Sequence, residues 1–311
     1  MPSSITHAYV ACDIYEKLDY KIKKKIPKMY LEDYKTYAQG PDIYYFYHIL
    51  NPFDKKAKKI RNFGSLCHNK KTNELFITLT KKVKKSKNVD EFLLLIGLFT
   101  HYMTDLTTHP FINYQASLAK FKPFKRKDIH FIIETYLDNY FIQKREKVPY
   151  KKFKGYNFCF NLQEKENVKN LLNVVMQEVF KKNDMGEYYF KSLHNMKNFF
   201  KYLRYDSLGL KKVFYNIINP IAVRIFRDVR YLSYNFKLDH DSFLNLDHET
   251  WYNLDAKNIT SQDSFLDLYD QVVETSKDMI EKLYNYIFLD EKMDLEKFFG
   301  NKSYSNGLPL K

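Results

Sequence analysis

The segment DEFLLLIGLFTHYMTDLTTHPF, residues 90–111, is the most informative part of the sequence about the fold. Its apolar residues recur three or four positions apart, as they do on one face of an α-helix. The pattern predicts a helix that opens at Asp90 and ends near Pro110, because proline cannot donate the next backbone hydrogen bond. Along one face of this helix, apolar side chains give way to three polar residues at steps of four: His101, Asp105 and His109.

Residues four apart lie on the same helix face, about 6 Å from one another. A second pair at this spacing, His130 and Glu134, lies within the apolar segment IHFIIETYL. Imidazole nitrogen and carboxylate oxygen are ligands that zinc accepts when no thiolate is available. The spacing alone leaves two interpretations open: a metal site, or hydrogen-bonded pairs of the kind common on helix surfaces.

The rest of the chain also has helical periodicity. Eight Gly and nine Pro in 311 residues are too few for the turns of a many-stranded sandwich. We therefore expect an all-α protein of roughly ten helices, forming a single domain over residues 1–311. Further helices are expected at 164–181, 187–205, 210–216, 221–236 and 264–288, with the polar stretch DHDSFLNLDHETWYNL, 239–254, as a loop.

Composition excludes several classes of protein. A hydrophobic content of 45% with 28% charged residues supports a real core and excludes a disordered chain. The net charge of +14 favours anionic partners such as phospholipid headgroups or nucleic acid. Cys12, Cys67 and Cys159 are too irregularly spaced for a disulfide framework. The N-terminus lacks the apolar stretch of a signal peptide, and Phe92–Phe99 is too short for a membrane span, so we expect a cytoplasmic protein.

Five short motifs, in this order over residues 6–138, resemble those of the bacterial zinc-dependent phospholipases C, which share a helical fold with single-strand-specific nucleases. They are Thr6-His7-Ala8; Gln39-Gly40-Pro41-Asp42; His68 after a Gly-containing segment; His101-Tyr102, Asp105 and His109-Pro110; and the pair His130 and Glu134. Each motif is weak by itself, but the ordered set is more specific. The toxins of this family carry a β-sandwich membrane domain, which the helical C-terminal half, residues 151–311, does not resemble.

The resemblance implies two to three Zn²⁺ ions held in the N-terminal part, residues 1–150. One ion would be bound by Asp42, His68, His101 and Asp105, a second by His109, His130 and Glu134, and a third by His7 with Asp105 as a bridging carboxylate. Asp42 would also be the general base, because a carboxylate beside the attacking water can accept its proton.

The chain departs from the family pattern in two places. Secreted members complete the third site with an N-terminal Trp, which this chain lacks; the Pro2 amine is a candidate replacement. The spacing from Asp105 to His109 is also two residues shorter than in the toxin, although it keeps His109 in helical phase.

The resemblance predicts a phosphoric ester hydrolase, acting as a phospholipase C on a phospholipid headgroup. A single-strand nuclease or another phosphodiesterase or phosphatase of the same fold is one alternative, with nucleic acid the less favoured partner. A noncatalytic zinc-binding protein is the other. Association with an anionic membrane surface would suit the basic charge, and no motif indicates a protein partner.

Overall fold

The computed structural model describes residues 4–49, 51, 53–118, 126–146, 153–161, 163–202, 210–225 and 243–310. These residues are predominantly helical, which confirms the all-α prediction. The first part of the chain contains α1 (Ser4–Lys17), α2 (Tyr20–Lys25), η1 (Lys28–Tyr30), α3 (Leu31–Tyr37), η2 (Gly40–Phe46), α4 (Lys55–Asn69), α5 (Thr72–Ser86), α6 (Val89–Ser117) and α7 (Arg126–Glu146). The second part contains α8 (Gly155–Cys159), α9 (Glu166–Phe180), α10 (Met185–Tyr202), α11 (Leu210–Ile225), strands β1 (Trp251–Asn253) and β2 (Ala256–Ser261), α12 (Phe265–Phe288) and α13 (Leu295–Phe299).

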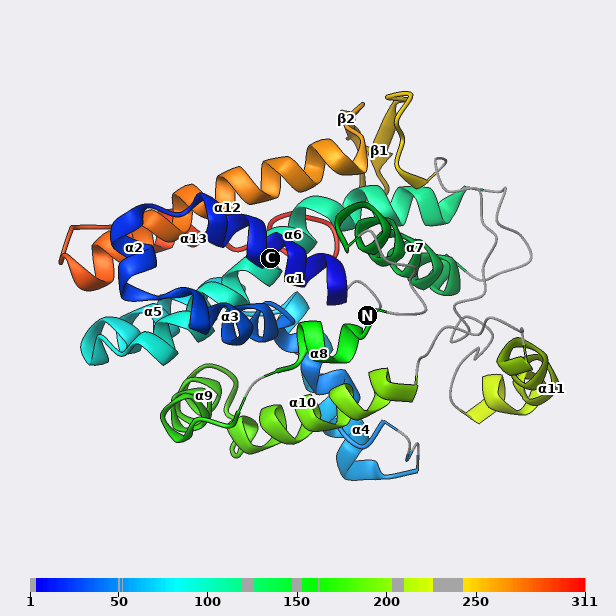
Figure 1. The fold of residues 1–311 in the computed structure, drawn as a ribbon, viewed down its shortest axis with the longest axis horizontal. Coiled ribbons are helices and arrows are strands. Elements are labelled where there is room, and N and C mark those ends of the chain that lie inside the picture. Colours follow the sequence, from blue (N-terminus) through cyan, green and yellow to red (C-terminus); the bar gives the residue numbers. More distant parts are fainter. Residues whose placement is uncertain are drawn as a thin grey trace.

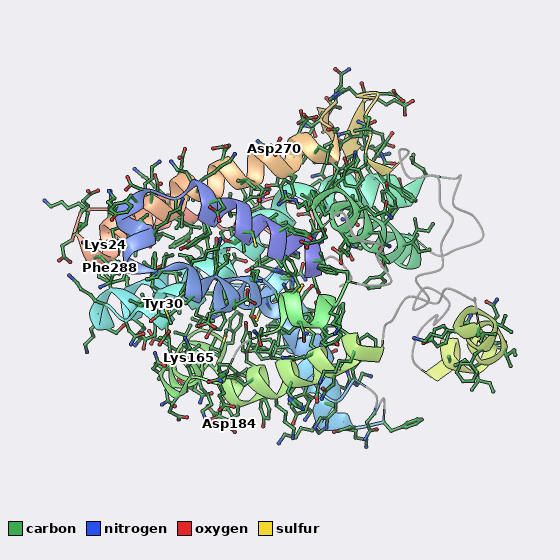
Figure 2. The ribbon with its side chains drawn as sticks, viewed as in Figure 1. Lys24, Tyr30, Lys165, Asp184, Asp270 and Phe288 are labelled. Carbon is green, nitrogen blue, oxygen red and sulfur yellow. The ribbon has the colours of Figure 1, made fainter. Side chains whose placement is uncertain are left out.

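Helix α6 is the central helix of the fold. Every residue from Phe92 to Asp105 is buried, because α1, α3, α7 and α12 pack around it (Figure 1). Side chains fill the spaces between these helices (Figure 2). Residues 92–105 of this helix are thus the centre of the core.

The predicted end of this helix near Pro110 is wrong, because α6 continues to Ser117. Proline lacks the amide hydrogen that would have reached the carbonyl of Leu106 four residues earlier. Beyond it, however, Phe111 and Ile112 are only 0% and 2% exposed. Burial of these side chains offsets the lost hydrogen bond, and the helix is retained.

The first turn of α1 is held by a buried carboxylate from α7. Asp138 accepts hydrogen bonds from the backbone amides of Ile5 and Thr6, at 3.4 and 2.8 Å, and from the Thr6 hydroxyl at 2.8 Å. It therefore acts as the N-terminal cap of α1 although it is remote in sequence. This cap fixes the position of α1 against α7.

The predicted loop 239–254 is wrong in part. Trp251 pairs with Ser261 and Tyr252 with Thr260 in an antiparallel hairpin, which is the only sheet among the described residues. The Trp251 ring packs edge-on against Phe111, and its indole nitrogen donates to the carbonyl of Asp263. The neighbouring Asp, His and Asn residues favour a loop, so the polarity of the sequence did not predict this short strand. Residues 239–242 lie outside the described part.

The predicted helix 210–216 and the first part of the predicted helix 221–236 form one continuous helix, α11. The described helix runs without a break through Pro220 to Ile225, and the residues that follow lie outside the described ranges. None of the described helices, α11 included, combines the length and apolar content that crossing a membrane requires.

Candidate metal centre

The structure brings all eight predicted ligands to one place, from five elements. His7 comes from α1, Asp42 from η2, His68 from α4, His101, Asp105 and His109 from α6, and His130 and Glu134 from α7. Elements that are distant in sequence thus place imidazole and carboxylate groups against each other, as the resemblance predicted. Their role as metal ligands stays a prediction.

Asp105 lies at the centre of this group. Its Oδ1 is 3.3 Å from Nε2 of His7 and 3.6 Å from Nε2 of His109. Its Oδ2 is 3.2 Å from Nε2 of His101 and 3.6 Å from Nε2 of His68. One buried carboxylate therefore faces four imidazoles, a position compatible with the predicted bridging role.

Three sets of donor atoms each lie within 4.8 Å of one another: His7 with His101 and Asp105, Asp42 with His68 and His101, and His109 with His130 and Glu134. The third set is the predicted second site. The residues of the predicted first site divide between the other two sets, which share His101. The arrangement therefore offers up to three overlapping cation positions.

The histidines are oriented by hydrogen bonds from their other ring nitrogen. Nδ1 of His68 donates to the carbonyl of Gly64 at 2.7 Å, and Nδ1 of His101 donates to that of Ala38 at 3.2 Å. Because a backbone carbonyl can only accept, Nδ1 carries the proton, and Nε2 is the nitrogen that faces the carboxylates. Metal-binding histidines are held in this way in proteins.

The donor atoms of this group are better arranged to bind a cation than to hydrogen-bond to one another. Nε2 of His68 and Nε2 of His101 face each other at 3.4 Å, and both face Asp105. If both rings are neutral with the proton on Nδ1, the two Nε2 lone pairs face each other and the negative charge of Asp105. A bound divalent cation would relieve this electrostatic repulsion. Buried Nδ1 of His7 has no hydrogen-bond partner among the described residues. Imidazole nitrogen and carboxylate oxygen donors of this kind suit zinc.

Without a metal, the carboxylates draw protons onto two of the imidazoles. Burial disfavours the charged form of His68, but hydrogen bonds to Asp105 and Asp42, together with their charges, raise its pKa to about 10. Burial likewise opposes the charge on His109, yet Asp105 and Glu134 raise its pKa to about 9. The pKa of His7 is lowered instead, by burial and by the charge of His101.

The three carboxyl groups are ionised at neutral pH. Burial favours the protonated form of Asp42, but its hydrogen bond to His68 and the nearby imidazole charges lower its pKa to about 2. The same balance, with His101 and His109 as neighbours, holds the pKa of Asp105 well below its usual range. Glu134 also has a strongly lowered pKa, because nearby positive charge, including that of His130, outweighs its burial. Charged oxygen donors are therefore available.

A cavity of about 290 Å³ opens over these residues. Seven of the eight predicted ligands line it, and His101, which is fully buried, lies beneath. Tyr45 and Phe131 add aromatic side chains to its wall. A small ester group can therefore reach the donor atoms from solvent.

Three residues of the centre were missed in the sequence. The carbonyl of Tyr304 accepts from Nδ1 of His109 at 3.0 Å across 195 positions, and Asn113 contacts Nδ1 of His130 through its Oδ1 at 3.2 Å. Ser305 lines the cavity. No spacing rule connects such distant positions, although Asn113 falls four residues after His109, on the ligand-bearing face of α6.

The replacement proposed for the missing N-terminal Trp cannot be placed, because Pro2 lies outside the described residues. The shorter spacing from Asp105 to His109 leaves both side chains on one face of α6, 3.6 Å apart. The shortened spacing is therefore compatible with a compact centre.

The chain matches a family model described as zinc dependent phospholipase C over residues 6–186. The matched segment contains all eight predicted ligands and ends before the hairpin, α12 and the C-terminal residues. No curated protein and no solved structure matches the chain.

Proposed function

Because the chain belongs to the zinc-dependent phospholipase C family, we propose that it hydrolyses the phosphodiester of a phospholipid headgroup at the candidate metal centre. One observation carries this proposal: five elements turn imidazole Nε2 atoms and carboxylates towards one another beneath an open cavity. A noncatalytic zinc protein would not need that opening, since structural zinc sites are closed.

The residues that would hold zinc are the eight named above, in two or three overlapping positions. Zinc held there would lower the pKa of a bound water and neutralise charge that develops on the phosphoryl group. The backbone carbonyls on Nδ1 fix the tautomer of His68 and His101, so that neither ring has to turn before it binds.

Asp42 is the proposed general base. Its side chain is 18% exposed and lines the cavity, so its carboxylate can receive a proton from a water molecule there. Glu134, 3% exposed, faces both His109 and His130, at 3.5 and 3.1 Å, and is better placed to bind metal than to receive a proton.

A single-strand nuclease is the second candidate, and one observation favours it. Tyr45 and Phe131 lie in the cavity wall, where aromatic rings can stack on unpaired bases. A phospholipid has no base to stack, so the substrate distinguishes the two candidates.

The test is hydrolysis of three substrates by the zinc-loaded protein: phosphatidylcholine vesicles, single-stranded DNA and a chromogenic phosphodiester. We expect Asp42→Asn to lower turnover by at least about 100-fold, the usual contribution of a general base. Asp54→Asn is the control, because Asp54 pairs with His48 and caps α4 on the surface. Full activity in Asp42→Asn would exclude Asp42 as the base, and no turnover of any of the three substrates would refute the proposed function.

We also propose that α11 brings the protein to an anionic membrane surface. Figure 2 shows its side chains apart from the other helices, and five apolar residues on one face are 56–71% exposed: Leu210, Val213, Phe214, Ile217 and Ile221. Every charged residue in the helix sequence, LKKVFYNIINPIAVRI, is basic. An exposed apolar face with basic flanks is typical of helices that lie in the headgroup region of a bilayer.

Sedimentation with vesicles tests the role of α11 without relying on activity. Burying an isoleucine side chain contributes at least about 1.5 kcal/mol, so Ile217→Glu should weaken binding to phosphatidylserine-containing vesicles about tenfold or more. Val174→Glu on α9 is the control, because Val174 is an isolated exposed apolar residue, 49% exposed. Equal binding by the two variants would argue against the role of α11.

A further inference from the structure

The C-terminal segment, Ser303–Gly307, makes three hydrogen bonds to residues of the candidate metal centre. The carbonyl of Tyr304 accepts from Nδ1 of His109 at 3.0 Å. The carbonyl of Ser305 accepts from Nδ2 of Asn113 at 2.9 Å. The amide of Tyr304 donates to the carbonyl of His68 at 3.2 Å. The segment therefore hydrogen-bonds the ring nitrogen of one predicted ligand, His109, directly and reaches that of a second, His130, through Asn113.

Asn113 connects the C-terminal segment to the ring of His130. Because its Nδ2 donates to the carbonyl of Ser305, the atom that it presents to His130 is the acceptor Oδ1, 3.2 Å from Nδ1. His130 therefore carries its proton on Nδ1 and turns Nε2 to Oε1 of Glu134, at 3.1 Å. Both histidines of the set His109, His130 and Glu134 thus depend on the same five C-terminal residues.

The ring nitrogens of His68 and His101 are held from elsewhere. Nδ1 of His68 is held by Gly64 within α4, and Nδ1 of His101 is held by Ala38 after α3. Neither hydrogen bond involves the C-terminal segment. Displacing this segment should therefore weaken the metal position at His109, His130 and Glu134 most, although Tyr304 also contacts His68 through its ring and its amide.

The segment is held firmly by its own packing. Tyr304 is 1% exposed, and its ring packs against those of His68 and Tyr102, with centroids 4.8 Å away in each case. The turn closes through a hydrogen bond from the Gly307 amide to the Ser303 carbonyl, at 2.9 Å. Gly307 has φ of +68°, and a Cβ there would lie 2.7 Å from the carbonyl oxygen of Leu106 on α6.

We infer that the C-terminal segment is a positioning element for the zinc ion at His109, His130 and Glu134: it fixes His109 directly and His130 through Asn113. This inference rests on the proposed function, because it assumes that zinc binds. It adds a part of the centre that lies more than 100 residues beyond the family match, which ends at residue 186.

The test compares two glycine substitutions in the 311-residue chain. Gly307→Ala places a methyl group against Leu106 and should displace the segment. Gly300→Ala is the control for backbone strain alone, since Gly300 has φ of +63° and ψ of 176°, and nothing lies within 4 Å of a Cβ there. Loss of such an outer partner commonly weakens metal affinity about 10–100-fold. We expect this loss for one zinc ion in Gly307→Ala only, measured by chelator competition and metal analysis.

A second variant removes the link to His130 without a change in the segment. Asn113→Ala should weaken the same ion, and adding it to His130→Ala should cause no further loss, because the ion is then already gone. If both variants bind every ion as the wild type does, or if all ions weaken equally, the positioning role is refuted. A wild-type chain that binds no zinc would instead refute the proposed function itself.

Discussion

Gly40 is the residue whose substitution tests the geometry of the candidate metal centre most directly. It opens η2, two residues before Asp42, and has φ of +59°. A Cβ at this position would lie 2.3 Å from Cδ2 and Cγ of His101 and 2.8 Å from its Cβ. All three distances are far below van der Waals contact, so Gly40→Ala requires the imidazole or η2 to move.

The His101 ring has little freedom to move. It stacks on His7 with centroids 4.4 Å apart, its Nδ1 donates to Ala38 at 3.2 Å, and its Nε2 lies 3.2 Å from Asp105. Overpacking of a filled core costs about 1–3 kcal/mol, and an alanine at positive φ adds about 1–2 kcal/mol. We therefore expect Gly40→Ala to lower the free energy of unfolding by about 2–5 kcal/mol.

The assay is urea unfolding of the metal-free protein together with zinc content after loading. Gly300→Ala is the control, because it introduces an alanine at a similar φ in open space. We expect Gly40→Ala to lose zinc bound through His101, and Gly300→Ala to keep it. If the two variants lose the same stability and both retain all zinc, the close approach of Gly40 to His101 does not maintain the centre.

Three further predictions follow from buried groups. Protonated His68 and His109, whose pKa values are raised to about 10 and about 9, stabilise the metal-free fold fully below about pH 6.5, and this stability is lost as pH rises through those two values. Urea unfolding of the zinc-free protein should show the loss. A similar loss in the zinc-loaded protein would contradict this prediction. Asp138→Ala leaves the first amides of α1 without an acceptor and should cost about 2–4 kcal/mol, whereas Asp138→Asn keeps an acceptor oxygen and should cost less; equal unfolding midpoints would count against the cap. Burial raises the pKa of Cys67 and Cys159, so a thiol reagent at pH 8 should modify these two thiols only in urea, whereas Cys12 is partly exposed. Rapid labelling of Cys67 or Cys159 in the folded chain would show that they are accessible.

Local spacing explains why the ligand-bearing helices could be predicted. His101, Asp105 and His109 recur every four residues, as do His130 and Glu134, and helix geometry alone places each group on one face. Pro110 misled the same reasoning, because burial of Phe111 and Ile112 outweighs a local signal for a helix end. The short strands at Trp251 and Ala256 were missed because their polar neighbours favour a loop.

The amino-acid sequence indicated the helical class and five of the candidate ligands, since these depend on residue type and on spacing within single helices. The other three, His7, Asp42 and His68, followed from the order of motifs in the family that the chain resembles. The packed helices alone reveal which ring nitrogen His68 and His101 present, that Gly40 lies against His101, and that Tyr304 and Ser305 hydrogen-bond to His109 and Asn113. The physical reason is that these features arise from contacts between backbone and side chains far apart in the chain. Such contacts exist only after the helices have packed, and no periodicity within one segment encodes them.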